Sequence, residues 1–445
     1  MPTLTVDTRS FRQLFVDAGI QEGFIPDYQR PYTWSEAQAG ALLDDLLTSR
    51  RQGHPEYYLG SVVLLRNEAE RRYELIDGQQ RVITLAIMHY CLDGCIPVGF
   101  DLRLHTQQSV ANVKTVRAFF EACSTHLAGL AGVFDAITFT RVITGREDEA
   151  FTFFDTQNNR GVTLGHTDFL KAYHLREIAS DEVQEHYAQQ WELADRPVAG
   201  ANLLATLFEQ VLWRARRWRG QRDLPFASRE RMLEMFQKQA LPLSGPFPQA
   251  AGPLHRWQPP GEAASPPAFS LRQPIFKGQH FFDYAACYTE VFTQLFEQPG
   301  PGSDIAHLRE FIGAVYSADM SSYLAQLLRL CLVVYYDCFG LACLREALHH
   351  FDYWIGSIRL GQQAVYAKTV TKALGEGPWN MIDLIIQAYL PEEVFAVIAA
   401  LPQARQVYAA EAGKDAHRGV QGRYRQRLLD YFGQPATDFS QRLAW

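Results

Sequence analysis

The residues with the clearest chemical potential lie at positions 77–81, inside the stretch YELIDGQQRVITLAIM of residues 73–88. An apolar strand pattern runs into Asp77 and Gly78 and then resumes as a helical pattern. The first backbone N–H groups of a helix lack internal acceptors, and together with the helix dipole they attract an anion, most often phosphate. Gly78 lets the backbone turn and approach a ligand closely. The segment therefore predicts a phosphate cradle between a buried strand and a buried helix.

The side chains of this segment suit the same chemistry. Gln79 and Gln80 can donate hydrogen bonds without adding charge, and Arg81 can grip phosphate oxygens with its forked guanidinium. Asp77 can hold a metal ion, orient a water or fix the loop. In a plainer interpretation Asp77 only caps the helix and Arg81 pairs on its surface, because Asp-Gly turns between strands and helices are common.

Two more polar loops accompany the first. Residues 25–34, IPDYQRPYTW, concentrate aromatic and hydrogen-bonding groups that suit base stacking and phosphate contact, although Trp34 can equally pack as a hydrophobic staple. In residues 153–176, FFDTQNNRGVTLGHTDFLKAYHLR, a polar turn interrupts two helical patterns. That turn can be a left-handed helix cap, and Asp168 with Lys171 a surface pair. Three such loops in one domain favour a shared site.

The elements that must position these loops alternate along the first hundred residues. The sequence predicts an extended segment, a helix with Ser35 as its N-cap, two strands and a second helix, at 23–34, 35–50, 57–65, 71–76 and 78–92. Helical patterns dominate after residue 100, at 106–128, 147–158, 165–195, 199–219, 228–238, 279–297, 304–318, 320–337 and 341–354.

A chain of 445 residues is longer than a domain with a single hydrophobic core usually is, which predicts more than one domain. We expect an α+β protein in which a small α/β unit is followed by a large helical region. The predicted parts are the α/β unit, a helical extension that completes the N-terminal domain, a Pro/Gly-rich loop or linker and a helical C-terminal domain, at 1–100, 101–239, 240–274 and 275–445.

The net charge of −7 gives no global basic signature, so contact with nucleic acid requires a local patch. The stretch LWRARRWRGQR at 212–222 is the main candidate for binding DNA or a partner, through Arg214, Arg216, Arg217 and Arg219. It can also be a solvated helix end whose tryptophans pack inward.

The seven cysteines are odd in number and lie mostly in apolar helical stretches. They indicate reduced core residues and no metal site, because the spacing of a zinc site is missing. The N-terminus lacks the pattern of a signal peptide, and the apolar runs are too short to span a bilayer. We therefore expect a cytoplasmic protein without membrane association.

Taken in order, the motifs IPDYQRPYTW, YLGSVVLL, IDGQQRVITL and FFDTQNNRGVTLGHTDFLKAYHLR resemble the N-terminal domain of GmrSD-type modification-dependent restriction systems. That domain is similar to the ParB and sulfiredoxin fold. The resemblance covers about residues 10–180, and RQPIFKGQHFFDYAACY at 272–288 resembles a recurrent segment of longer members. It implies nucleotide binding and an expectation of NTP hydrolysis, with Mg²⁺ as the candidate accompanying ion.

The resemblance also implies a set of site residues. The catalytic residues would be Asp77, Gln80 and Arg81, and the nucleotide-binding residues would be Gln29, Arg30, Gly78, Gln79, Asn159, Arg160, Gly161 and Lys171. Phosphoryl transfer needs positioned positive charge and a held water, and these residues include the required types.

Many relatives end in an HNH nuclease domain, which needs a catalytic His and further metal ligands in a ββα setting. Here His349 and His350 lie together on a helical pattern and His417 stands alone. AGKDA at 412–416 lacks the flanking residues of a Walker loop. The resemblance is therefore to a subunit without an HNH domain.

Three hypotheses follow. The first is an NTP-binding and NTP-hydrolysing subunit of a prokaryotic antiphage restriction system, which acts with DNA, a separate nuclease or helicase subunit, or further copies of itself. The second is a non-enzymatic, nucleotide-responsive module that binds DNA or protein. The third, a nuclease that uses the N-terminal fold itself, ranks last because the carboxylates do not cluster as a metal site would.

Overall fold

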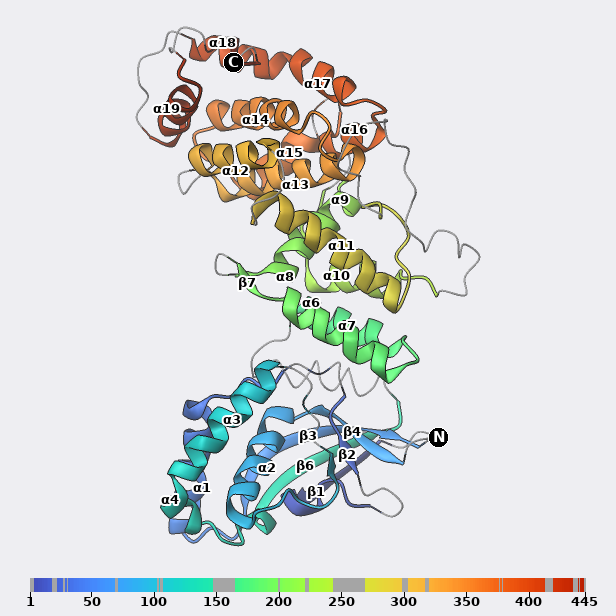
Figure 1. Ribbon diagram of the computed structural model, residues 1–445, viewed down its shortest axis with the longest axis vertical. Coiled ribbons are helices and arrows are strands. Elements are labelled where there is room, and N and C mark those ends of the chain that lie inside the picture. The colour runs from blue at the N-terminus through green and yellow to red at the C-terminus, as the bar shows by residue number, and fades with distance from the viewer. Residues whose placement is uncertain are drawn as a thin grey trace. The chain divides into compact units, whose positions relative to one another are not determined.

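The described chain forms two compact units, Met1–Glu192 and Leu193–Trp445 (Figure 1). The first contains a mixed sheet with helices and the second is almost entirely helical, which confirms the predicted α+β class. The finer division predicted from the sequence stays a prediction. The computed structural model describes residues 4–17, 22–26, 29, 31–68, 71–101, 104, 107–146, 165–198, 201–220, 224–242, 269–297, 303–316, 320–375, 377, 379–412, 419–434, 439 and 441–443.

The sheet of the first unit has six strands in the order β1-β6-β3-β4-β2-β5. β1 and β6 are antiparallel, β6 and β3 parallel, β3 and β4 antiparallel, and β4, β2 and β5 parallel. The strands are β1 Thr5–Ser10, β2 Gly23–Phe24, β3 Tyr57–Asn67, β4 Arg72–Asp77, β5 Phe100–Asp101 and β6 Ile137–Thr144.

Four helices and one face of this sheet share a hydrophobic core, and Figure 1 shows these helices beside the strands. Alternate residues of β3, Val62 and Leu64, belong to that core, as the period of two in a strand requires. The helices are α1 Glu36–Arg51, α2 Gln79–Asp93, α3 Gln107–Ala122 and α4 Ser124–Ala128. Two further helices follow, α6 His166–Arg176 and α7 Asp181–Ala194.

Local signals in the sequence account for most of the elements around α2. Ser35 caps α1 and forms a capping box with Gln38, so the predicted helix and its N-cap are confirmed. The predicted strands correspond to β3 and β4. Gly78, the N-cap of α2, has a φ of 94°, a left-handed conformation that only glycine adopts cheaply.

The prediction of a helical region after residue 100 missed one central strand of the sheet. β6, with the sequence ITFTRVIT, lies between β1 and β3 inside the segment expected to be a helical extension. Nearly every residue of β6 is buried, including the polar residues Thr138 and Arg141, so burial does not alternate along the strand. Its β-branched residues were the available signal.

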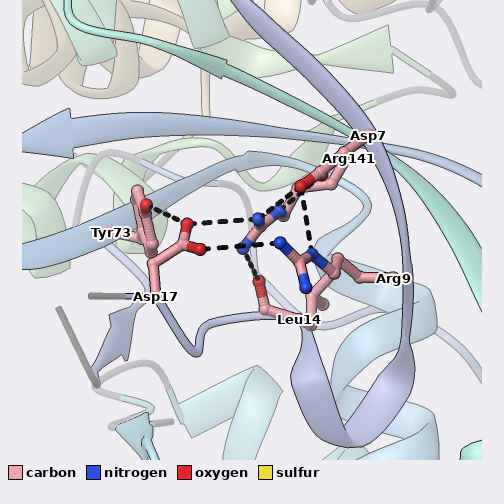
Figure 2. A network of polar contacts seen from close by, with 6 residues as sticks. All are labelled: Asp7, Arg9, Leu14, Asp17, Tyr73 and Arg141. Carbon is pink, nitrogen blue, oxygen red and sulfur yellow. Dashed lines mark hydrogen bonds and ion pairs between the residues drawn. The ribbon is translucent and has the colours of Figure 1, made fainter.

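A polar network built on Arg141 ties β1 to the rest of the sheet (Figure 2). The buried guanidinium of Arg141 donates from Nε and Nη2 to both carboxylate oxygens of Asp7, at 2.9 and 2.7 Å, and from Nη1 to the carbonyl of Leu14 at 3.0 Å. Its Nη2 also lies 3.1 Å from Asp17, whose carboxylate accepts a hydrogen bond from the hydroxyl of Tyr73 at 2.6 Å. One cation therefore joins the N-terminal strand, the turn after it and β4.

The same network shifts the ionisation of its members. The hydrogen bonds from Arg141 hold the pKa of Asp7 below its usual value of 3.8, although partial burial opposes them. Burial, with Asp17 as the neighbouring acceptor, raises the pKa of Tyr73 to about 12. Asp7 therefore stays ionised and Tyr73 stays protonated at neutral pH.

The second unit is organised around two long helices, α13 Ser322–Phe339 and α14 Leu344–Gly361. α13 contacts α15 and α16, and α14 contacts α12, α17, α18 and α19. The other elements are β7 Pro197–Val198, β8 Ala201–Asn202, α8 Leu203–Leu207, η3 Phe208–Leu212, α9 Trp213–Arg217, α10 Arg229–Leu233, η4 Glu234–Lys238, α11 Gln279–Phe296, α12 Ser303–Val315, α15 Ala367–Gly375, α16 Met381–Gln387, α17 Pro391–Ala400, α18 Pro402–Glu411 and α19 Val420–Phe432. Across the described residues, every helix is too short or too polar to traverse a lipid bilayer.

The Arg141 network predicts a pH-dependent contribution of Asp7 to stability. Asp7→Asn should lower the free energy of unfolding of the first unit by about 3 kcal/mol at pH 7, the lower end for a broken buried pair, because Asp17 still pairs with Arg141. A carboxyl whose pKa is lowered by folding stabilises above its ordinary value of 3.8 and loses this effect as the pH falls through the lowered value. The difference between the two proteins should therefore shrink below about pH 4. Hydrogen exchange of the backbone amides of β1 and β6, in the full chain, measures this difference in stability.

Asp135→Asn is the matched control. Asp135 is largely exposed and lies 3.9 Å from Arg12, so its loss should cost less than about 1 kcal/mol. Equal losses of stability in the two variants would contradict the role assigned to Arg141.

Candidate functional site

The candidate site is the junction where β4 ends at Asp77 and α2 begins after Gly78. The N-cap residue of α2 is Gly78, which has no side chain to cap the helix, and the first amides of a helix have no acceptor within the helix itself. α2 has 15 residues and carries no acidic residue in its first turn. Within α2 itself, no carboxylate offsets the positive end of the dipole, and Asp77 lies one residue before the N-cap.

Gln80 holds the first loop against the start of α2. Its buried Oε1 accepts a hydrogen bond from the amide of Thr33 at 2.8 Å and a longer one from that of Trp34 at 3.3 Å. Its Nε2 donates to the carbonyl of Pro31 at 3.0 Å. The Gln80 side chain therefore fixes residues 31–34 in place, which is a positioning contact.

Tyr32 anchors the same loop from the other side. Its hydroxyl lies 2.7 Å from that of Thr84 on α2, and its backbone amide donates to the hydroxyl of Ser109 at 2.8 Å. Asn112 of α3 donates to the carbonyl of Tyr32, also at 2.8 Å. Burial raises the pKa of Tyr32 to about 12, so this phenol stays neutral.

Arg81 bonds back to β3. Its Nη1 donates to the carbonyl of Leu59 and its Nη2 to the carbonyl of Ser61, both at 2.8 Å. These carbonyls flank Gly60, where the register of β3 against β6 shifts and φ is 105°. The guanidinium therefore stabilises a β-bulge.

Asp77 and Gln29 complete the junction. The carboxylate of Asp77 lies 3.8 Å from Nη2 of Arg81 and is mostly shielded from solvent. Nε2 of Gln29 donates to the carbonyl of Ile76 at 3.1 Å, directly before Asp77. The structure therefore brings Gln29, Asp77 and the start of α2 together, as the sequence predicted.

Other predicted site residues lie elsewhere or outside the described residues. Arg30, Asn159, Arg160 and Gly161 are among the residues not described. Gln79 is buried at the start of α2. Lys171 is buried in α6, where its Nζ lies 2.6 Å from Glu192 of α7, and Asp168 closes a capping box with the amide of Gly165. The predicted surface pair between Asp168 and Lys171 is therefore replaced by separate contacts.

The predicted basic cluster divides into internal and exposed residues. Arg214 donates to Gln326 at 2.9 Å, and burial lowers its pKa to about 10. Arg216 donates to the carbonyls of Leu271 and Gln273, and both tryptophans of the stretch are buried. Arg217 and Arg219 remain exposed.

Sequence reasoning did not identify the residues that shape the junction. These residues contact the junction or its loop but are distant in sequence from residues 77–81: Gly60, Ser61, Ser109 and Asn112. A glycine within a strand pattern signals a bulge, so Gly60 was detectable. In the described part of the chain, no three His, Cys, Asp or Glu side chains are placed to hold a metal ion.

Two protein families match the chain, and their spans follow the two units. Residues 11–175 match the GmrSD restriction endonuclease, N-terminal domain, which confirms the resemblance inferred from the motifs. Residues 183–413, more than half of the chain, match a family of unknown function, DUF7834. The chain belongs to this family.

The DUF7834 match covers most of the second unit, and the GmrSD match contains the candidate junction. The GmrSD match indicates a component of a restriction system, with an involvement of DNA. No curated protein matches the chain. For this member of DUF7834, the chemistry must therefore come from the residues themselves.

The link between Arg81 and the bulge predicts an unusual cost for one small substitution. A Cβ on residue 60 would fall on Nη1 of Arg81, which two hydrogen bonds hold in place. Gly60→Ala should therefore lower the free energy of unfolding by about 2–3 kcal/mol, from left-handed strain and lost hydrogen bonds. Urea unfolding with hydrogen exchange in β3 measures this cost.

Gly53→Ala provides the control, since Gly53 also has positive φ but open space around its Cβ position, and strain alone costs about 1–2 kcal/mol. In an Arg81→Ala background, the cost of Gly60→Ala should fall towards that of the control. An unchanged cost would show that Arg81 does not hold the bulge.

Proposed function

We propose that the protein is an NTP-binding, NTP-hydrolysing component of a prokaryotic antiphage restriction system, and that the polyphosphate binds at the start of α2. One observation carries the proposal: a helix N-terminus with a glycine N-cap lies directly beside Asp77 and Gln29 in a GmrSD-type domain. Amides at such a terminus bind phosphate without needing a charged side chain.

The contacts of the site assign different roles to the predicted residues. The amides after Gly78 take the phosphate oxygens, while Gln80 and Arg81 keep the loop and β3 in position around them. Asp77 is the carboxylate nearest to the bound phosphates, so it orients the attacking water or a Mg²⁺ ion. Binding then depends mainly on the backbone and hydrolysis mainly on Asp77.

A second candidate function has its own supporting observation. Gln80 and Arg81 already bond to protein groups, so their side chains position the loop and β3 instead of acting on a ligand. Such a site suits a non-enzymatic module that binds nucleotide and changes its affinity for DNA or a protein partner. A separate nuclease would then supply the cleavage.

Asp77→Asn separates binding from hydrolysis. The purified full chain should release phosphate from at least one NTP, and Asp77→Asn should reduce the rate at least about tenfold, a modest share of the effect of a positioned catalytic group. Calorimetric affinity for the same NTP should stay within about threefold, because the amides that bind phosphate are unchanged. Glu36→Gln, an exposed change in the same unit, should alter neither quantity.

The outcomes distinguish the candidates. Equal phosphate release by the Asp77→Asn and wild-type proteins would contradict the enzymatic role. Binding by the wild-type protein without any release would select the non-enzymatic module. An absence of NTP binding would overturn both.

A further inference from the structure

A fixed turn in the second unit presents Arg219 to solvent. Arg219 follows the end of α9, and Gly220 after it has a φ of 64°. The amide of Gly220 donates to Asp383 of α16 at 2.5 Å, and Asn380 donates to the carbonyl of Gly220 at 2.8 Å. The N-terminal end of α16 therefore holds the turn from both sides.

A second arginine locks the same turn. Arg272 donates from Nε to the carbonyl of Ala215 at 2.8 Å and from Nη2 to that of Trp218 at 3.3 Å. Its Nη1 lies 2.5 Å from the carboxylate of Asp383. Arg272 begins the segment 272–288, which resembles a recurrent segment of longer family members, so this segment helps to shape the turn.

The turn concentrates positive charge around one carboxylate. Arg272 pairs with Asp383, and the charges of Arg216, Arg272 and Asp383 all act on Arg219. Arg219 itself makes no hydrogen bond or ion pair within the described part of the chain. Burial, followed by the charges of Arg272 and Arg216, lowers the pKa of Arg219. A positive charge held at such a place is relieved by an external anion.

An exposed tryptophan accompanies this charge. Trp379 directly precedes Asn380, whose side chain donates to the carbonyl of Gly220, the residue after Arg219, so one hydrogen bond joins the two segments. Its side chain is 59% exposed, whereas both tryptophans at the end of α9 are buried. An exposed indole and an exposed guanidinium on joined segments are the side-chain types that bind a stacked base and its phosphate.

We propose that Arg219, Trp379 and Arg272 form a binding site for unpaired nucleotides of a nucleic acid. Trp379 stacks on a base, Arg219 binds the adjacent phosphate, and Arg272 keeps the turn in place. The inference rests on the proposed role with DNA but does not require NTP binding or hydrolysis. It places the contact on two of the exposed side chains and excludes Arg214, whose guanidinium is internal.

The test is fluorescence anisotropy of the full chain with a labelled oligothymidylate of about 20 nucleotides, without NTP, at several salt concentrations. Trp379→Ala should weaken binding about tenfold. Arg219→Ala should weaken it and reduce the slope of log affinity against log salt by about 0.7. An oligouridylate in place of oligothymidylate distinguishes RNA from DNA as the source of the nucleotides.

Matched controls come from the same unit. Tyr389→Ala removes another exposed aromatic side chain and Arg345→Ala another exposed arginine, and both should bind like the wild-type protein. Wild-type affinity in Trp379→Ala and Arg219→Ala, or equal weakening in the controls, would overturn the proposal. So would equal competition by a duplex. Asp77→Asn should bind the oligonucleotide normally, which separates failure here from failure at the NTP site.

Discussion

The hydrogen bonds from Arg81 to the carbonyls on either side of Gly60 are the constraint on which the junction depends. They join the first turn of α2 to a bulge in β3, and Gln80 joins the same turn to the loop at residues 31–34. A helix can offer its first amides to a ligand only if its terminus is held still and left uncapped. Here the side chains of Gln80 and Arg81 hold the terminus of α2, whose N-cap is a glycine without a capping side chain. The polar side chains of residues 80 and 81 therefore have a structural role of their own.

The two units correspond closely to the spans of the two family matches. The first contains the GmrSD-type domain and the junction, and the second corresponds to most of the DUF7834 match. The arginine network at β1 in the first unit and the arginine-stabilised turn after α9 in the second use the same physical device. In each, a guanidinium bonds to carbonyls and carboxylates that are distant in sequence. Such a cation fixes local geometry because five donors leave few alternative arrangements.

The sequence predicted the elements whose signals are local and missed those that depend on distant partners. Ser35 and Gln38 lie three residues apart, so the start of α1 could be read directly. β6 was missed because it buries polar residues such as Thr138 and Arg141, and because its partner strands lie far along the chain. The family resemblance implied the grouping of Gln29 with Asp77, whereas the partners of Arg81 depend on a bulge more than fifteen residues away. Likewise, the spacing of the arginines alone could not distinguish Arg214 from Arg219. Arg214 donates a hydrogen bond to Gln326, whereas Arg219 is exposed.

The most direct test of the central claim is an NMR titration of the full chain, with selectively ¹⁵N-labelled glutamine and glycine, against a non-hydrolysable NTP analogue. If the polyphosphate binds the start of α2, the amide signals of Gly78, Gln79 and Gln80 should shift together, with one saturating affinity. The side-chain amide signals of Gln80 should move little, because that group keeps its bonds to the loop. Saturable binding that leaves the amides of residues 78–80 unmoved would contradict the claim that this helix terminus is the phosphate site.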